Sequence, residues 1–411
     1  MMSIHSDAQQ IIQSALSACL PDAAVRRALE GKTFSSGRIY LVAAGKAAWQ
    51  MAQCAAQMLG DRLTAGVVVT KYDHSKGDIP HCTVYEGGHP VPDENSYRGT
   101  RAAMELVQNL TAQDTVVFLV SGGGSALFEC PLVPGEDLAR LTKDLLACGA
   151  DIVEMNTLRK RLSAVKGGKF AQLCAPAQVY AIVLSDILGD PLDMIASGPA
   201  YPDSSTKEDA WAAVEKYHLS LTDEMKKLLD VETPKKLDNV ETVITGSVRE
   251  LCAAAAQACE TLGYQPTILT DRLCCQAKEA GSFLASIAKS HEASDHSLAF
   301  LAGGETVVQL TGSGLGGRNQ ELALAAAPGI AGMKDTVVFS LGSDGTDGPT
   351  DAAGGLVDGE TLDKLSAAGL SVHQVLADND AYHALKAVDG LLITGPTGTN
   401  VNDVAVVLLK R

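Results

Sequence analysis

A glycine-rich segment of this sequence, Ser121-Gly-Gly-Gly-Ser125, directly follows the apolar run Thr115–Val120. Glycines let the backbone approach a ligand closely, and their N–H groups can donate to phosphate or carboxylate oxygens. The alternative is a flexible turn at the end of a strand. The segment lacks the spacing of a Walker A loop. We expect an anion to be bound by Ser121, Gly122, Gly123, Gly124 and Ser125.

A second glycine-rich segment, Gly312-Ser-Gly-Leu-Gly-Gly317, has the G-x-G-x-x-G spacing of dinucleotide-binding loops. It follows a predicted strand, Thr306–Leu310, and precedes a predicted helix. The acid that should end the next strand is misplaced, because Asp335 precedes that strand. Arg318 and Asn319 come directly after the glycines, and a guanidinium there suits phosphate or carboxylate better than hydride transfer. We favour an anion loop over a nicotinamide site and over a purely structural turn.

Cations gather at two further places in the chain. Lys46 follows the apolar run Ile39–Ala43, where it projects toward the crevice at a strand end, and we predict that it is catalytic. Between Met155 and Lys169, a helical register puts four polar or charged residues on one face. A solvated helix face is the alternative, but a basic face in a chain of formal charge −16 is a candidate anion site. The face consists of Asn156, Arg159, Ser163 and Lys166, and we take Asn156, Arg159 and Lys166 as substrate-binding residues.

Acidic side chains follow two other apolar runs. Asp186 and Asp190 come after one, and Asp344 and Asp347 after another. Such carboxylates can bind Mg²⁺ or accept the proton of a hydroxyl group, and an Asx-turn is the alternative for each cluster. The sequence does not show which of these acids binds the metal and which accepts the proton. We assign Asp186 to catalysis and Asp190, Asp344 and Asp347 to the metal. His89, which titrates near neutral pH, lies in a turn-rich loop. Together these loops favour phosphoryl transfer with Mg²⁺.

Short apolar runs alternate with helical patterns along most of the chain, which predicts parallel sheets covered by helices on both faces. The polar segment Tyr201–Asp238 is predicted as a surface helical segment between two domains. The fold class is therefore α/β with two domains, a Rossmann-like one over residues 1–240 and a second over residues 241–411, each with a mostly parallel sheet. The predicted strands are Ile39–Ala43, Gly66–Thr70, Thr115–Val120, Val179–Leu184, Val240–Thr245, Leu298–Leu301, Thr336–Leu341, Leu391–Thr394 and Val404–Leu409.

The composition excludes several classes of protein. The 411 residues include 33 Lys and Arg against 49 Asp and Glu, the opposite of the balance expected for a nucleic-acid binder. No apolar run approaches the roughly 18 residues of a membrane span. Met1–Gln10 lacks the basic region of a secretory signal. Ten Cys without a CxxC pair indicate reduced thiols. We therefore expect a cytoplasmic protein with neither nucleic-acid nor membrane partners.

These segments together resemble the glycerate 2-kinase family, whose C-terminal region is called the MOFRL domain. One such segment alone is weak, but their order and number make the resemblance specific. The matching stretches are Gly87–Asp93, Ser121–Leu127, Met155–Ser163 with Lys166–Gly168, Ser185–Asp190 with Ile195–Pro199, Gly303–Thr306, Gly316–Glu321, Asp344–Asp351 and Thr394–Asp403.

The resemblance implies transfer of the γ-phosphate of ATP to the 2-hydroxyl of D-glycerate, in a cleft between two domains. It implies that Lys46 and Arg318 are the residues most tied to activity, with ATP as cosubstrate and Mg²⁺ as the ion that the acidic loops indicate. A monomer and a homodimer both remain open. Two alternatives are kept. An NAD(P)H-dependent hydroxypyruvate reductase draws superficial support from Gly312–Gly317, and a non-enzymatic anion sensor is disfavoured by the acids beside the glycine loops.

Overall fold

A computed structural model describes residues 3–411, and these divide into two compact units. The N-terminal unit holds residues 24–184 and 190–245, and the C-terminal unit holds the described residues up to 23 together with 185–189 and 246–411. The predicted domains were residues 1–240 and 241–411. In the structure, helix α1 (Ile4–Ala18) packs on α11 (Val248–Thr261) of the C-terminal unit, and strand β6 (Val240–Gly246) completes the N-terminal sheet.

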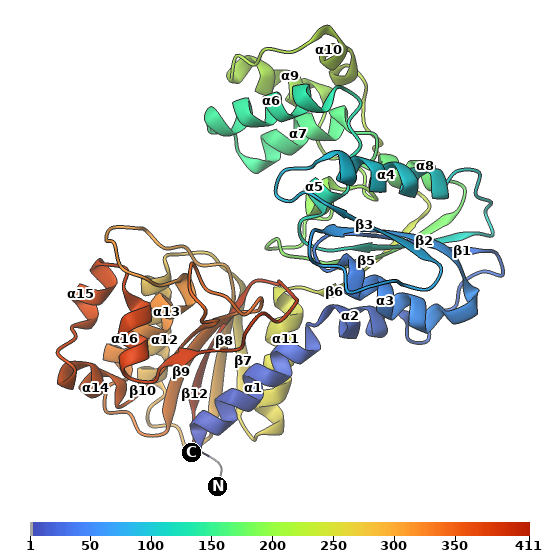
Figure 1. Ribbon diagram of the computed structural model, residues 1–411. Helices are drawn as coiled ribbons and strands as arrows, with labels where there is room; N and C mark the ends of the chain where they lie inside the picture. Colours follow the sequence, from blue (N-terminus) through green and yellow to red (C-terminus); the bar gives the residue numbers. More distant parts are fainter. Residues whose placement is uncertain (1–2) are drawn as a thin grey trace. The chain divides into compact units, whose positions relative to one another are not determined.

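The N-terminal unit contains a six-stranded sheet in the order β3-β2-β1-β4-β5-β6, which is the Rossmann order (Figure 1). All pairings from β3 to β5 are parallel. Strands β1 and β4 are buried along their whole length, as expected for strands covered on both faces. The strand order reverses between β1 and β4, so ligands are expected at the carboxyl ends of these two strands. The bounds are β1 Ile39–Ala44, β2 Leu63–Lys71, β3 Cys82–Gly87, β4 Thr115–Val120 and β5 Gln178–Leu184.

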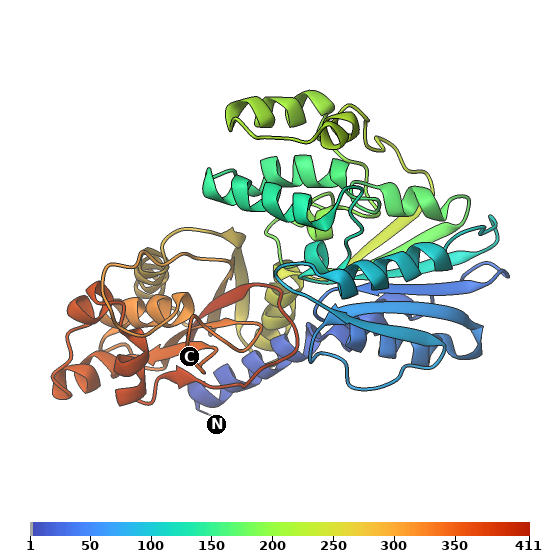
Figure 2. The same ribbon diagram turned by 45° about the horizontal axis from the view of Figure 1, so that its top comes forward.

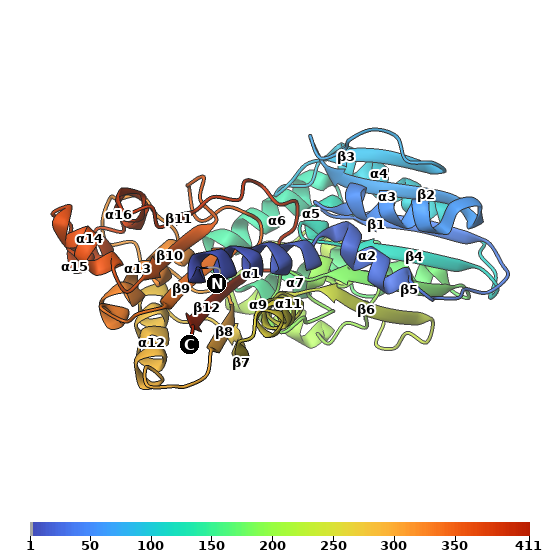
Figure 3. The same ribbon diagram turned by 90° about the horizontal axis from the view of Figure 1, so that it is seen from below.

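Helices cover both faces of this sheet (Figures 1 and 3). On one face lie α2 (Pro21–Leu29) and α3 (Ala48–Leu59); on the other lie α4 (Glu94–Leu106), α5 (Gly124–Leu127) and α8 (Lys169–Cys174). The short helices η1 and η2 span Gly60–Arg62 and Ile195–Ser197.

Four further helices of the N-terminal unit form a separate group with a core of its own, drawn in greens in Figure 2. Leu138, Leu158 and Met225 are among the buried residues of this core. The segment predicted to join two domains, Tyr201–Asp238, therefore contributes two helices to this group instead. The group consists of α6 (Gly135–Ala147), α7 (Ile152–Leu162), α9 (Lys207–Lys216) and α10 (Asp223–Leu229).

The C-terminal unit contains a second six-stranded sheet, in the order β11-β10-β9-β12-β8-β7. Strands β7, β8, β9 and β11 run in one direction, while β10 and β12 pair antiparallel with their neighbours. The predicted α/β class with mostly parallel strands is confirmed. The reversed strand β12 matters for function, because it brings its first residue, Asp403, beside the last residues of β8 and β9. The bounds are β7 Gln265–Leu273, β8 Leu298–Gly304, β9 Thr336–Gly342, β10 Gly354–Asp358, β11 Leu391–Leu392 and β12 Asp403–Leu409.

Each face of this second sheet has its own core. Val337 and Phe339 pack toward α1 and α11, while Val338 between them packs toward the helices of the other face. Figure 3 shows α1 lying along its face of the sheet. No helix among residues 3–411 is long and apolar enough to span a membrane. The opposite face is covered by α12 (Ala277–Ser290), α13 (Arg318–Ile330), α14 (Thr361–Ala367), α15 (Val372–Ala377) and α16 (Ala381–Ala387).

Candidate active site

The loops after β1 and β4 meet at the point where the N-terminal strand order reverses. The backbone N–H of Lys46 donates to the carbonyl of Gly122 at 2.8 Å, and the N–H of Ala47 donates to Ser121 Oγ at 3.1 Å. Gly45 has φ +128°, and a Cβ there would lie 2.2 Å from Ser121 Oγ, so only glycine fits. The predicted lysine and the predicted glycine loop therefore form one structure.

This loop offers unused hydrogen-bond donors. Within residues 3–411, the backbone N–H groups of Gly122, Gly123 and Ser125 have no acceptor, and the ammonium of Lys46 has none either. All four residues are partly exposed. Backbone donors and a cation that converge at a strand end are suited to an anionic group such as a phosphate or carboxylate. The predicted anion-binding role of this loop stays a prediction with a plausible geometry.

His89 borders the same loop. A Cβ added to Gly123, which has φ +83°, would lie 3.1 Å from both His89 Nε2 and Lys46 Cγ, so the two side chains flank this glycine. Burial lowers the pKa of His89, and the charge of Lys46 lowers it further. The imidazole is therefore neutral at physiological pH and can accept a hydrogen bond.

Three residues predicted to bind substrate lie behind the Ser121–Ser125 loop. Lys166 Nζ and Arg159 Nη2 donate to the carbonyl of Ser125, at 2.6 and 3.2 Å. Lys166 is fully buried and pairs with Glu129 at 2.6 Å, and burial lowers its pKa to about 8. Asn156 is also buried and accepts a hydrogen bond from Ser197. Lys166 and Asn156 are thus placed to position the loop, not to touch substrate.

The helical register predicted for these residues is wrong. Helix α7 ends at Leu162, so Lys166 is not on the face that carries Arg159. The residues converge because the chain folds back after the helix. The N–H groups of Gly167 and Gly168 donate to the carbonyls of Ser197 and Gly198, at 3.0 and 2.7 Å. These hydrogen bonds join segments that are distant in sequence. The two glycines therefore hold the returning chain against residues 197–198.

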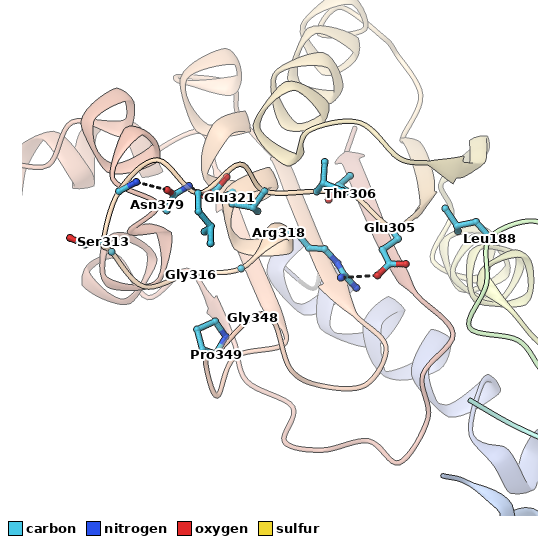
Figure 4. Close-up of a pocket in the computed structure, with 16 residues that line it drawn as sticks. Leu188, Glu305, Thr306, Ser313, Gly316, Arg318, Glu321, Gly348, Pro349 and Asn379 are labelled. Atoms are coloured by element: carbon cyan, nitrogen blue, oxygen red, sulfur yellow. Dashed lines mark hydrogen bonds and ion pairs between the residues drawn. The ribbon is translucent and has the colours of Figure 1, made fainter. Parts of the chain in front are cut away.

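Arg318 is the first residue of α13 and lies at the carboxyl edge of the C-terminal sheet. Its Nε and Nη2 donate to the two oxygens of Asp403, at 2.5 and 3.0 Å, and its Nη1 donates to Glu305 at 3.0 Å (Figure 4). Burial raises the pKa of Asp403 to about 6 although Arg318 opposes this change. The bidentate pair fixes the guanidinium while a third of the side chain remains exposed.

Further acidic groups adjoin this arginine. A Cβ on Gly342 would lie 3.3 Å from Asp344 Oδ1 and 3.4 Å from Asp403 Oδ1, so the two carboxylates approach one point. Asn402 Nδ2 donates to the carbonyl of Asp186 at 3.2 Å and to Glu305 at 3.3 Å. The structure thus brings the predicted residues Arg318 and Asp344 together, with the backbone of Asp186 nearby. It adds Glu305 and Asp403, to which the sequence analysis assigned no role.

Two residues predicted to bind metal or substrate make hydrogen bonds inside the protein. Asp347 is buried, and its carboxylate accepts hydrogen bonds from the N–H groups of Asn319 at 3.1 Å and Gln320 at 2.8 Å. Asp347 therefore caps the start of α13. Asn319 is 1% exposed and accepts a hydrogen bond from Ser340. The proposed substrate contact of Asn319 is disfavoured, because its side chain lies in the interior.

The predicted metal ligands are not gathered in one unit. Asp190 lies in the N-terminal unit, and Asp344 and Asp347 lie in the C-terminal unit. In the part of the chain that the structure describes, no three His, Cys, Asp or Glu side chains are arranged to hold a metal. Mg²⁺ in nucleotide sites typically needs only one or two carboxylates in addition to phosphate oxygens. Glu305 and Asp344 match that number of carboxylates, whereas both oxygens of Asp403 accept hydrogen bonds from Arg318.

We expect Asp347→Ala to lower the free energy of unfolding by about 2 kcal/mol, because two buried N–H groups at the start of α13 lose their acceptor. Urea denaturation followed by circular dichroism measures this loss. Asp344→Ala is the comparison, since among residues 3–411 that carboxylate accepts a single hydrogen bond, from the backbone N–H of Thr346. Equal stability of the two variants would contradict the capping role.

The first four residues of the second glycine-rich segment use their N–H groups within the protein. The N–H groups of Gly312 and Leu315 donate to Asn379 and Asp380, each at 2.9 Å, and those between them bond to Asp378. The strand predicted at Thr306–Leu310 is also wrong, because this stretch is irregular. A dinucleotide loop needs a preceding strand and free N–H groups in its first turn, and the stretch Gly312–Leu315 has neither feature.

Comparisons with known proteins identify the family of this chain. A model described as "Domain of unknown function (DUF4147)" matches residues 7–230, and that of the MOFRL family matches residues 298–403. A relative from Thermotoga maritima named D-glycerate 2-kinase is 51% identical over 413 residues, covering 99% of both chains. The chain belongs to the glycerate 2-kinase family. The resemblance inferred from the motifs is confirmed.

Other proteins related to the glycerate 2-kinase family match over the same extent. A protein from Pyrococcus horikoshii named glycerate 2-kinase is 39% identical over 443 residues, covering all of this chain and 99% of its own. A crystal structure described as glycerate kinase from Thermotoga maritima matches with a TM-score of 0.94 at 51% identity, covering 98% of this chain and 99% of that chain. The glycerate 2-kinase similarity therefore includes both the Lys46 loop and the Arg318 cluster.

Proposed function

We propose that this protein is a glycerate 2-kinase, which transfers the γ-phosphate of ATP to the 2-hydroxyl of D-glycerate and gives 2-phosphoglycerate and ADP. We infer this reaction from the full-length similarity to the D-glycerate 2-kinase of Thermotoga maritima. The site agrees with it, because the free N–H groups of the Gly122–Gly124 loop and Lys46 can bind a phosphate or carboxylate group.

The two clusters differ in charge, and this difference divides the substrates between them. The loop of the N-terminal unit combines Lys46 with free N–H donors, so it receives the carboxylate of D-glycerate and the phosphate formed at its 2-position. The C-terminal cluster combines Arg318 with the acids Glu305 and Asp403, so it disfavours a free carboxylate. A nucleotide that carries its phosphate charge together with a divalent cation suits this cluster.

The residues of this chain contribute mainly by positioning and electrostatics, as is general for phosphoryl transfer. Arg318, held by Asp403, neutralises charge on the transferring group. Mg²⁺, when bound, would supply further neutralisation, and Glu305 and Asp344 are the carboxylates that would hold it together with phosphate oxygens. Asp186 remains the predicted acceptor of the hydroxyl proton.

The alternative of a hydroxypyruvate reductase loses its support in the structure, because the backbone donors of Gly312–Leu315 are all engaged by residues 378–380. A binding module without catalysis gains no support. A cytoplasmic location and a monomeric or homodimeric state remain predictions, as does the absence of nucleic-acid and membrane partners.

A coupled assay tests the proposed reaction. Purified protein is incubated with ATP, Mg²⁺ and D-glycerate, and the product is followed through enolase, which accepts 2-phosphoglycerate. We expect a signal that does not need added phosphoglycerate mutase. A signal that requires the mutase would indicate a 3-kinase. Oxidation of NADH by hydroxypyruvate without any kinase signal would favour the reductase.

A further inference from the structure

A large pocket of the C-terminal unit adjoins Arg318 (Figure 4). Its volume is about 690 Å³, and its walls come from the segment 305–318, with Glu321 and Asn379 at another side. We propose that this pocket binds the nucleoside of the ATP donor, with the amino group of the adenine base at Glu321 and the phosphates toward Arg318. This inference rests on the proposed kinase function and assigns the nucleotide to specific residues.

The size and lining of the pocket fit a nucleoside better than a three-carbon acid. Its volume lies within the roughly 300–1,000 Å³ of drug-sized and cofactor sites. Val307 and Leu310, which line it, leave 54% and 81% of their surface exposed. Apolar side chains gathered in this way at the rim of a pocket indicate an apolar ligand surface. A purine ring and its ribose supply such a surface, and D-glycerate does not.

The glycine-rich segment serves as a wall of this pocket. The N–H groups of Gly312–Leu315 are engaged by residues 378–380, so this part of the segment offers no phosphate cradle. A Cβ on Gly312 would lie 2.3 Å from Asp378 Cα, and one on Gly314 would lie 2.4 Å from Asp380 Cβ. The glycines are therefore required for close packing against residues 378–380, and this packing holds the wall in place.

Glu321 provides a specific acceptor in this pocket. The residue is 3% exposed, and its Oε1 accepts a hydrogen bond from Asn379 Nδ2 at 2.7 Å. Asn379 is itself fixed, since its Oδ1 accepts from the N–H groups of Thr311 and Gly312. Within residues 3–411, the hydrogen bond of this carboxylate is made at Oε1, and no donor reaches Oε2. Its carboxylate thus lacks one donor that a ligand N–H can provide.

An amino-bearing base is the part of the substrates that supplies this donor. Burial raises the pKa of Glu321, because the protein withholds solvation from the carboxylate. The exocyclic amino group of adenine restores a hydrogen bond, whereas the carboxylate of D-glycerate would be repelled. Arg318 lies one helical turn before Glu321 and lines the same pocket, so it is a cation within reach of the phosphates.

The decisive experiment compares ATP with ITP, whose base carries a carbonyl oxygen where adenine carries its amino group. Glu321→Gln keeps an acceptor for Asn379 and replaces Oε2 with an NH₂ donor. We expect this variant to raise the KM for ATP about tenfold or more at an unchanged KM for D-glycerate, and to lose or invert the preference for ATP over ITP. Calorimetric titration with ADP and IDP gives the same comparison without turnover.

Two further variants complete the test. Glu279→Gln makes the same change in the first turn of α12, on an exposed residue outside the pocket, and we expect unchanged constants. Leu310→Asp alters an exposed wall residue without burying anything and should weaken ADP and IDP binding alike.

The outcomes separate this inference from the proposed function. Wild-type kinase activity with normal ADP affinity and base preference in Glu321→Gln, or with normal ADP and IDP affinity in Leu310→Asp, would overturn the pocket assignment alone. Selective ADP binding that depends on Glu321, without phosphorylation of D-glycerate, would support the pocket and overturn the kinase.

Discussion

Arg318→Ala should reduce kcat for D-glycerate phosphorylation by about 10³-fold or more, because an arginine aimed at the transferring phosphoryl group contributes on this scale. The side chain is well placed for the role: two of its nitrogens are fixed by Asp403 and a third by Glu305, and part of it stays exposed. Steady-state kinetics with the enolase-coupled assay measure the loss. The KM for D-glycerate should change little, since that substrate is assigned to the other cluster.

Stability must be separated from catalysis in this variant, because Arg318→Ala leaves Asp403 buried without its cation. Arg318→Lys keeps the charge but loses the bidentate geometry, so we expect an intermediate loss of about 10–100-fold. Arg249→Ala removes another arginine that pairs with an aspartate, on the exposed side of α11, and should leave kcat unaltered. A folded Arg318→Ala protein with kcat within tenfold of wild type would remove Arg318 from the mechanism.

The sequence predicts the strand ends of this protein well, for a physical reason. Strands buried on both faces are apolar throughout, so runs such as Thr115–Val120 are visible without any partner. The residue after such a run lies at the carboxyl edge of a parallel sheet. This reasoning finds Lys46, the Ser121–Ser125 loop and Asp344 from local patterns alone.

The direction of a strand, in contrast to its position, could not be predicted from the local sequence. Asp403 comes before an apolar run, so a parallel reading would place it at the edge opposite the site. In the structure β12 is antiparallel to both neighbours, and Asp403 therefore meets Gly304 and Gly342 at the carboxyl edge. The pairing of β12 depends on contacts across the whole unit, which local hydrophobicity does not encode.

The two glycine-rich segments illustrate a second limit. Both contain glycines after an apolar run, so the sequence predicts an anion site at each. They differ in how many N–H groups are already bonded: those of Gly312–Leu315 have acceptors far along the chain, at Asp378, Asn379 and Asp380. A backbone donor looks the same in sequence whether it is free or used. The helical face predicted after Met155 is wrong for a similar reason, because local sequence did not show where the helix ends. Helix α7 ends at Leu162, and Lys166 beyond it is buried.

Lys46→Met should lower kcat/KM for D-glycerate by about 10²–10³-fold, the scale of losing one charged group aimed at developing or bound negative charge. No residue of the described chain accepts a hydrogen bond from its ammonium, so the substitution should leave the fold intact. This makes Lys46 a cleaner probe than the buried Lys166, whose removal would leave the buried Glu129 with only the more distant Arg159 among the described residues.

The Lys46 result depends on position as well as on charge. Lys46→Arg should recover part of the activity, whereas Lys76→Met, which removes an exposed loop lysine of the same unit, should have no effect. The KM for ATP should rise less than the KM for D-glycerate, because the free N–H groups and Lys46 are assigned to the acid substrate. If Lys46→Met raised only the KM for ATP, the Gly122–Gly124 loop would hold the nucleotide phosphates instead, and the division of substrates by charge would be wrong.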